Sequence, residues 1–133
     1  MGTLTKNLDA PSLIASQSLA ASAVVRATAD LRTADGAFLT IKITNGATGP
    51  NPACTCTISV APTAGSTPAA AAVGTDWKFL QSFLGSTVAG AVIERSLEIS
   101  EKIAHVCVEF SGQNQTVTVE AQITRLTGKT YTP

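Results

Sequence analysis

The sequence predicts an all-β domain, an antiparallel two-sheet β-sandwich or jelly roll of about seven or eight strands. Apolar residues recur at every second position in several short segments, which is typical of strands with one buried face. Clusters of Gly, Pro, Asn, Asp and Ser separate these segments. No segment has the periodicity of a helix longer than two turns. The chain has 133 residues, which is the usual size of one domain.

Residues 1–12 are predicted to form an N-terminal arm, and residues 13–133 a single β-sandwich domain. The first segment is polar, contains Pro11 near its end and shows no strand pattern. Leu4 and Leu8 give it apolar side chains that can lie across a neighbouring molecule. The alternative is a frayed end of the chain, which is common in isolated proteins.

Three strands are predicted in the first half of the chain. Apolar and polar side chains alternate in residues 23–31, 37–44 and 54–60. The pair Asp35-Gly36 separates the first two segments and suits a backbone with positive φ, so these two strands are predicted to form a hairpin.

Two Pro- and Gly-rich segments are predicted to be loops. Residues 45–52 contain two glycines and two prolines, which favours a structured loop between strands. Residues 61–75 are rich in Pro, Ala, Gly and Ser and predict a longer loop that is mobile or pressed against a partner.

The second half of the chain predicts strands in residues 77–84 and 88–99 and then a hairpin. Alternation is most regular in residues 103–110 and 116–126, and Gly112 and Asn114 mark a tight turn between them. These last two strands are predicted to pair with each other.

Charge and hydropathy exclude some classes of partner. Nine basic residues balance nine acidic ones, and only 14% of residues are charged, so nucleic acid is not expected as a partner. A surface with few charges is typical of a protein that packs against other proteins. No apolar run reaches the roughly 20 residues of a membrane span. No small-molecule substrate is predicted.

No catalytic, cofactor-binding or metal site is predicted. Cys54, Cys56, Cys107 and His105 could be read as zinc ligands, but a Cys-x-Cys inside a strand lacks the tight knuckle of structural zinc sites. Buried free thiols in a reducing cytosol are the favoured interpretation. His105 is the single histidine, and its place in the alternation predicts an outward, solvent-side or subunit-interface position. The chain is therefore predicted not to be an enzyme.

Aromatic residues give a second binding hypothesis. Trp77, Phe79 and Phe83 could form a stacking platform for a sugar or for single-stranded nucleic acid. Aromatic side chains in strands are more often part of the core, and that interpretation is favoured. Scattered glutamates on outward positions do not form the facing pair that a glycosidase needs.

Two segments carry a resemblance to a known family. Residues 37–50, read AFLTIKITNGATGP, and residues 105–121, with Phe110-Ser111-Gly112 before a closing strand, resemble small virion structural proteins of tailed bacteriophages. The resemblance is to proteins that decorate or cement the head. Trp77 is similar in position to the Trp that follows the central strand in that group.

The resemblance implies a non-enzymatic component of the virion that is made and folded in the host cytoplasm. Its implied partners are the major capsid protein and copies of itself, in a trimer, over junctions of the shell. Two alternatives stay open: a neck, tail or baseplate component, and a carbohydrate-binding or adhesion module. The predicted assembly contacts lie in the arm and the two loops: Leu4, Leu8, Asn45, Gly46, Pro50, Pro52, Pro62 and Pro68.

Overall fold

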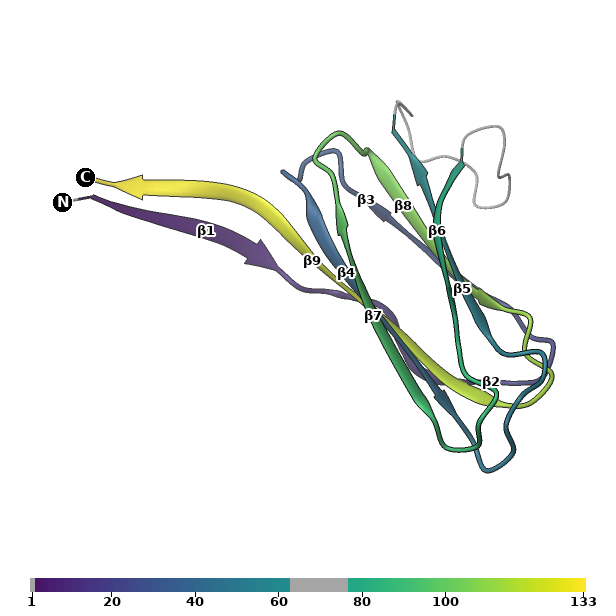
Figure 1. Cartoon of the computed structure of the whole chain (residues 1–133). Helices are drawn as coiled ribbons and strands as arrows, with labels where there is room; N and C mark the ends of the chain where they lie inside the picture. Colours follow the sequence, from purple (N-terminus) through teal and green to yellow (C-terminus); the bar gives the residue numbers. More distant parts are fainter. Residues whose placement is uncertain (1, 63–76) are drawn as a thin grey trace.

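The computed structural model describes residues 2–62 and 77–133 of the chain, and these residues form strands, turns and bends only. The described strands belong to two antiparallel sheets that face each other (Figure 1). Their bounds are β1 Thr3–Asp9, β2 Ser12–Leu19, β3 Val25–Asp30, β4 Ala37–Asn45, β5 Thr55–Ala61, β6 Lys78–Leu84, β7 Val92–Ile99, β8 His105–Ser111 and β9 Val117–Thr132.

The larger sheet has five strands and the smaller has four. In the larger sheet the order is β1-β9-β4-β7, and β2 also pairs with β9. In the smaller sheet the order is β3-β8-β5-β6. The chain therefore forms the predicted all-β, two-sheet sandwich.

Side-chain alternation places the core between the two sheets. In β4, the side chains of Leu39, Ile41 and Ile43 are buried and the intervening ones are more exposed. Burying one face of each sheet against the other removes apolar surface from water, which is the main driving force for this fold. The largest buried side chains of the core also include Ile58, Ile99, Val106, Val108, Phe110 and Ile123.

Both predicted hairpins are wrong. β3 pairs with β8 in the smaller sheet, whereas β4 pairs with β7 and β9 in the larger one. Likewise β8 pairs with β3 and β5 in the smaller sheet, whereas β9 pairs with β1, β2 and β4 in the larger one. The turns at Asp35-Gly36 and at residues 111–115 therefore carry the chain from one sheet to the other. Gly36 does have the positive φ, 111°, that the sequence predicts.

The structure also contains strands that the sequence pattern did not predict. β1 lies inside the predicted arm, and β2 begins at Ser12, the last residue of that arm. The last strand was expected to end at residue 126 but continues to Thr132. Figure 1 shows β1 and the end of β9 projecting together from one end of the sandwich.

The side of the smaller sheet that faces away from the main core carries a second cluster of buried residues. Ala61, Trp77 and Cys107 pack together there. The alternation of β8 places Cys107 opposite Val106 and Val108, which belong to the main core.

The described residues contain no helix that is long and apolar enough to cross a membrane.

Candidate assembly surface

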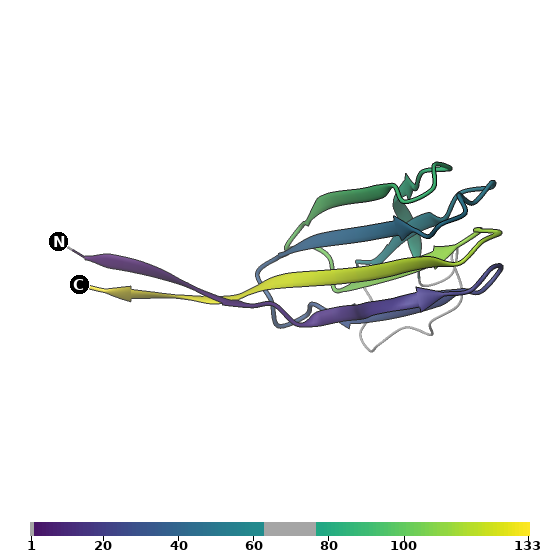
Figure 2. The ribbon, with the colours of Figure 1, turned by 90° about the horizontal axis from the view of Figure 1, so that it is seen from below.

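The projecting element is a two-stranded antiparallel ribbon made by β1 and residues 125–132 of β9. Pairing runs from Thr3 opposite Thr132 to Asp9 opposite Arg125. Figure 2 shows the ribbon leaving the sandwich, beyond the end of the smaller sheet. The ribbon therefore lacks the second layer that covers the inner face of the rest of the larger sheet. Two strands alone are marginally stable in water, so a ribbon of this kind gains stability from whatever it packs against.

One face of the ribbon is apolar and basic, and it continues the outer face of the larger sheet. Leu4, Lys6 and Leu8 alternate along β1 on this face. Lys6 is opposite Lys129, and Leu4 is opposite Tyr131. A Cβ atom added to Gly2 would collide with the Tyr131 ring, which places the ring on the same face. Leu4, Leu8 and Tyr131 are 59%, 60% and 64% exposed.

An ion pair joins the two strands at the base of the ribbon. Arg125 donates from Nε to Asp9 Oδ1 at 2.9 Å and from Nη2 to Asp9 Oδ2 at 2.6 Å. These hydrogen bonds lower the pKa of Asp9 and raise that of Arg125. The pair fixes the point at which the ribbon leaves the sandwich.

A register shift near the base changes the course of the ribbon. Pairing shifts between Asn7 and Leu8, so that Thr127 has no direct partner opposite it in the ladder. Its hydroxyl instead donates to the Asn7 carbonyl at 3.0 Å. Such bulges bend and twist a strand pair, and Figure 1 shows the ribbon turning away from the direction of the sheet.

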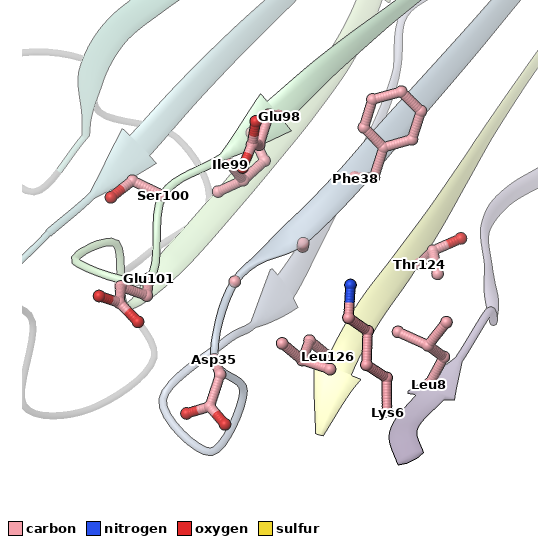
Figure 3. Close-up of a pocket in the computed structure, with 12 residues that line it drawn as sticks. Lys6, Leu8, Asp35, Phe38, Glu98, Ile99, Ser100, Glu101, Thr124 and Leu126 are labelled. Atoms are coloured by element: carbon pink, nitrogen blue, oxygen red, sulfur yellow. The ribbon is translucent and has the colours of Figure 1, made fainter. Parts of the chain in front are cut away.

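A hollow of about 750 Å³ lies where the ribbon meets the sandwich. Figure 3 shows its wall, with Phe38 on β4 and with Leu8 and Leu126 on the ribbon. Phe38 is 49% exposed although it is aromatic. The carboxylates of Asp35, Glu98 and Glu101 also line the hollow, and Glu98 is the cross-strand neighbour of Phe38. The twelve lining residues are Lys6, Leu8, Asp35, Gly36, Ala37, Phe38, Glu98, Ile99, Ser100, Glu101, Thr124 and Leu126.

Further along, the outer face of the larger sheet is polar. Lys42 lies directly between Glu94 on β7 and Glu120 on β9. In the next row the hydroxyls of Thr40 and Ser96 are 3.1 Å apart. Cross-strand rows of this kind stabilise a sheet face that contacts water. Apart from Val92, which is 52% exposed at the far end of β7, the large exposed apolar side chains of this sheet, Leu4, Leu8, Phe38 and Tyr131, lie on or near the ribbon.

The predicted loop at residues 45–52 lies at the opposite end of the sandwich (Figure 1). Asn45 is 4% exposed, and its Nδ2 donates to the carbonyls of Ser86 at 2.7 Å and Val88 at 2.8 Å. This buried amide ties the end of β4 to the segment between β6 and β7.

A second amide fixes the rest of that loop. Asn114 accepts a hydrogen bond from the Asn51 backbone N–H at 2.8 Å and donates to the Asn51 carbonyl at 2.7 Å. Pro50 is buried, whereas Gly46 and Pro52 are exposed. Asn45 and Pro50 therefore have contacts within the chain, and Gly46 and Pro52 present surface.

The eight predicted contact residues do not form one site. Leu4 and Leu8 lie on the ribbon, and the four residues of the 45–52 loop lie at the other end. Pro62 is exposed just after β5, and Pro68 lies outside the described residues.

The sequence interpretation missed Phe38, Lys129 and Tyr131. The alternation of Leu4, Lys6 and Leu8 could have indicated a strand, and residues 129–132, Lys-Thr-Tyr-Thr, contain strand-forming residues. The pairing of two such distant segments has no local signal.

The thiols and the histidine are enclosed. Cys54, Cys56 and Cys107 are free and buried. Burial raises the pKa of Cys54 to about 11 and that of Cys56 to about 12, so both are neutral thiols at physiological pH. Among the described residues, no group of three or more His, Cys, Asp or Glu side chains is placed to hold a metal ion.

His105 shares the face of β8 that carries Cys107, away from the main core as the alternation predicts, but its side chain is buried, which corrects the predicted solvent-side position. Its Nδ1 lies 3.9 Å from Asp30 Oδ1, beyond hydrogen-bonding distance. Neither ring nitrogen has a hydrogen-bond partner in the described part of the chain. Asp30 instead receives hydrogen bonds from Arg32, which hold its pKa well below the usual range. A histidine enclosed in this way cannot reach a substrate.

The aromatic residues at β6 are divided between core and surface. Trp77 is 1% exposed and lies in the small cluster with Ala61 and Cys107. Phe79 is 60% exposed, which corrects the expectation that it belongs to the core. Phe83 is half-buried against the main core. The three rings therefore do not form one platform.

No protein-family model matches the sequence, and no curated protein matches it significantly. The structure is similar to the K3 cleaved adhesin domain of Lys-gingipain from Porphyromonas gingivalis, with a TM-score of 0.57 and 9% identity, over 82% of this chain and 72% of the other. The K2 cleaved adhesin domain of Lys-gingipain gives 0.52 and 10%, over 93% and 88%.

A third similar structure is the VP2 subviral particle of infectious bursal disease virus. It has a TM-score of 0.49 and 10% identity, over 90% of this chain and 32% of the other. At such low identities the two adhesin domains show a shared β-sandwich fold and no more.

Proposed function

We propose that this chain is a non-enzymatic structural protein of a tailed-bacteriophage virion that decorates or cements the head shell. The observation that carries the proposal is the ribbon, whose apolar and basic face is exposed and lies beyond the second sheet. An exposed apolar face of this kind marks a surface for protein partners. The sequence resemblance at residues 37–50 and 105–121 supplies the class of particle.

The proposed mechanism is additive. Each copy covers a joint between shell subunits and buries surface on both sides of it. A specific interface of standard size buries about 1,600 Å² in total, which stabilises the joint when it includes well-packed apolar side chains. Many copies on one head increase the work needed to separate its subunits under the pressure of packaged DNA.

The burial of the reactive side chains supports a non-enzymatic role. His105 and the three thiols are enclosed. Nucleophilic and acid–base catalysis require groups that reach the substrate. The proposed partners are the major capsid protein and further copies of this chain, without nucleic acid, membrane or small-molecule substrate.

The two alternatives differ in what they require. A neck, tail or baseplate component would occupy another part of the same particle. A carbohydrate-binding module would need an exposed aromatic platform, and the burial of Trp77 weighs against it.

Gold-labelled antibody against the chain, applied to intact tailed particles, tests the proposal. Label distributed over the head is the expected result, and purified heads stripped of the protein should take it up again to a saturating level. Label confined to the neck or tail would favour that alternative, and the absence of label on any particle would overturn the proposal. A glycan-binding assay with the purified chain tests the carbohydrate alternative separately.

A further inference from the structure

The ribbon face and the hollow at its base have opposite charge. Lys6 and Lys129 face each other across the ribbon. Asp35, Glu98 and Glu101 line the hollow, and Lys6 lines its ribbon side, so three carboxylates outnumber one ammonium group there. None of these five side chains has an ion-pair partner among the residues that the structure describes. Each copy therefore carries an unpaired basic surface and an unpaired acidic one.

Both surfaces also carry exposed apolar side chains. Leu4 and Tyr131 flank the two lysines on the side away from the sandwich. Phe38 and Leu126 lie in the hollow. We call Leu4, Lys6, Lys129 and Tyr131 the ribbon tip. Tip and hollow each combine an apolar contact with a charge, which is the pattern of a protein interface with a hydrophobic centre and a charged rim.

Tip and hollow lie on the same face of one continuous sheet. Leu8 and Lys6 line the hollow and belong to the face of β1 that carries Leu4. Leu4 and Leu8 are four residues apart, or about 13 Å along a strand. Two copies stacked face to face with their strands antiparallel therefore place each tip over the hollow of the other. Such an arrangement is reciprocal, as a two-fold interface requires.

From this geometry we propose that the hollow is a docking site for the ribbon tip of a second copy of this chain, in a two-fold dimer. Leu4 and Tyr131 of each copy pack on Phe38 of the other, and the two lysines meet the carboxylates of the hollow. The contact buries Leu4 and Tyr131, whose side chains are exposed on the outer face of the ribbon. This inference goes beyond the proposed function, because it is a contact between two copies of this chain that requires no other component of the virion.

Two charge-reversal variants test the docking. One carries Lys6→Glu and Lys129→Glu in the tip, and the other carries Asp35→Lys and Glu98→Lys in the hollow. Each variant alone brings like charges together at both joints. Light scattering after size-exclusion chromatography should show that the wild-type chain is a dimer. A dilution series should give a dimer dissociation constant at least about tenfold larger for either variant.

Mixing the two variants gives the decisive result. In a mixed dimer, the acidic tip meets the basic hollow and the basic tip meets the acidic hollow, so both joints are attractive and dimerisation should return. A closed ring of three copies cannot alternate the two variants and would keep a repulsive joint. Rescue as a dimer therefore supports the two-fold arrangement.

A matched control exchanges the charges of Lys42 and Glu120, which are direct neighbours on the same sheet face outside the hollow. Lys42→Glu with Glu120→Lys should leave dimerisation unchanged. Circular dichroism confirms that each variant is folded. A wild-type chain that stays monomeric at its highest soluble concentration, a wild-type trimer, or a mixture without rescue would each overturn the proposal. Head labelling is a separate measurement, so its outcome and this one are distinguishable.

Discussion

The sandwich and the ribbon are built from the same kind of alternating strand, but they differ in what covers them. In β4, alternate side chains enter a core between two sheets, and Leu39 is 1% exposed. In β1, Leu4, Lys6 and Leu8 share the outer face of the ribbon, and Leu8 is 60% exposed. An alternating strand specifies two faces, and only a second layer turns one of them into a core. The ribbon is thus a strand pair that no second layer covers among the described residues.

The largest expected difference between the two regions appears when the same side chain is truncated in each. Leu39→Ala should lower the free energy of unfolding by about 2–5 kcal/mol, because it removes buried methyl groups and leaves a cavity. Leu8→Ala deletes the same atoms from an exposed site and should change it by no more than about 0.5 kcal/mol. Urea unfolding at a concentration where the chain is monomeric measures both.

Similar losses for the two leucine variants would contradict the comparison. They would mean that the ribbon is packed within the protomer as tightly as the sandwich.

Buried amides hold the end of the sandwich that is opposite the ribbon. Gln113 is 1% exposed, and its Nε2 donates to the carbonyls of Ala20 at 2.8 Å and Ala23 at 2.9 Å. Gln113→Ala removes both hydrogen bonds and should cost about 1–3 kcal/mol, although the Ala20 carbonyl keeps the Ala23 N–H as a donor at 3.1 Å. Gln122→Ala, on the exposed face of β9, is the matched control and should be nearly neutral. Thermal melts of both variants measure how much the Gln113 amide contributes to the stability of the fold.

Alkaline pH should weaken the sandwich through its buried thiols. Burial raises the pKa of Cys54 to about 11 and that of Cys56 to about 12, from 9.0. Above pH 9 the unfolded chain loses thiol protons that the folded chain keeps, so the stability falls as pH rises. The slope is at most about 1.4 kcal/mol per pH unit for each thiol.

Urea unfolding at pH 8, 9 and 10 measures this slope. In a Cys54→Ala, Cys56→Ala double variant the contribution of these two thiols should disappear, and only that of Cys107, whose pKa burial also raises, should remain. If the double variant keeps the wild-type slope, groups other than these two thiols cause the decrease in the free energy of unfolding at alkaline pH.

The smallest expected effect concerns the base of the ribbon. Hydrogen bonds from Arg125 lower the pKa of Asp9. The stabilisation by the ionised carboxylate is therefore present above the unfolded pKa and is lost as pH falls through the lower folded value. Asp9→Asn should increase hydrogen exchange at ribbon amides while core amides keep their protection. Glu120→Gln is the control, and equal exchange changes in ribbon and core would show that the ion pair acts on the whole fold.

The candidate surface was only partly accessible from the sequence. Leu4 and Leu8 were predicted as contacts because apolar residues in a polar segment require an explanation. Tyr131 and Lys129 were not, because they are next to β1 only through pairing across more than a hundred residues. Local sequence patterns carry no information about such a contact. The role of Asn45 inside the protomer was hidden for the same reason, since its partners lie at Ser86 and Val88.

By itself the sequence determined the class of fold and the face that each central strand buries. The alternation of Leu39, Ile41 and Ile43 and that of Val117, Val119, Ala121 and Ile123 are both confirmed by burial. Tertiary structure alone decided which strands pair, because every strand offers the same backbone donors and acceptors along both edges. It also decided that His105 is buried and that residues 3–9 form a ribbon with the end of β9. Turn residues such as Asp35-Gly36 permit the chain to reverse direction, but the packing of the whole core determines whether the next strand joins the same sheet or the other one.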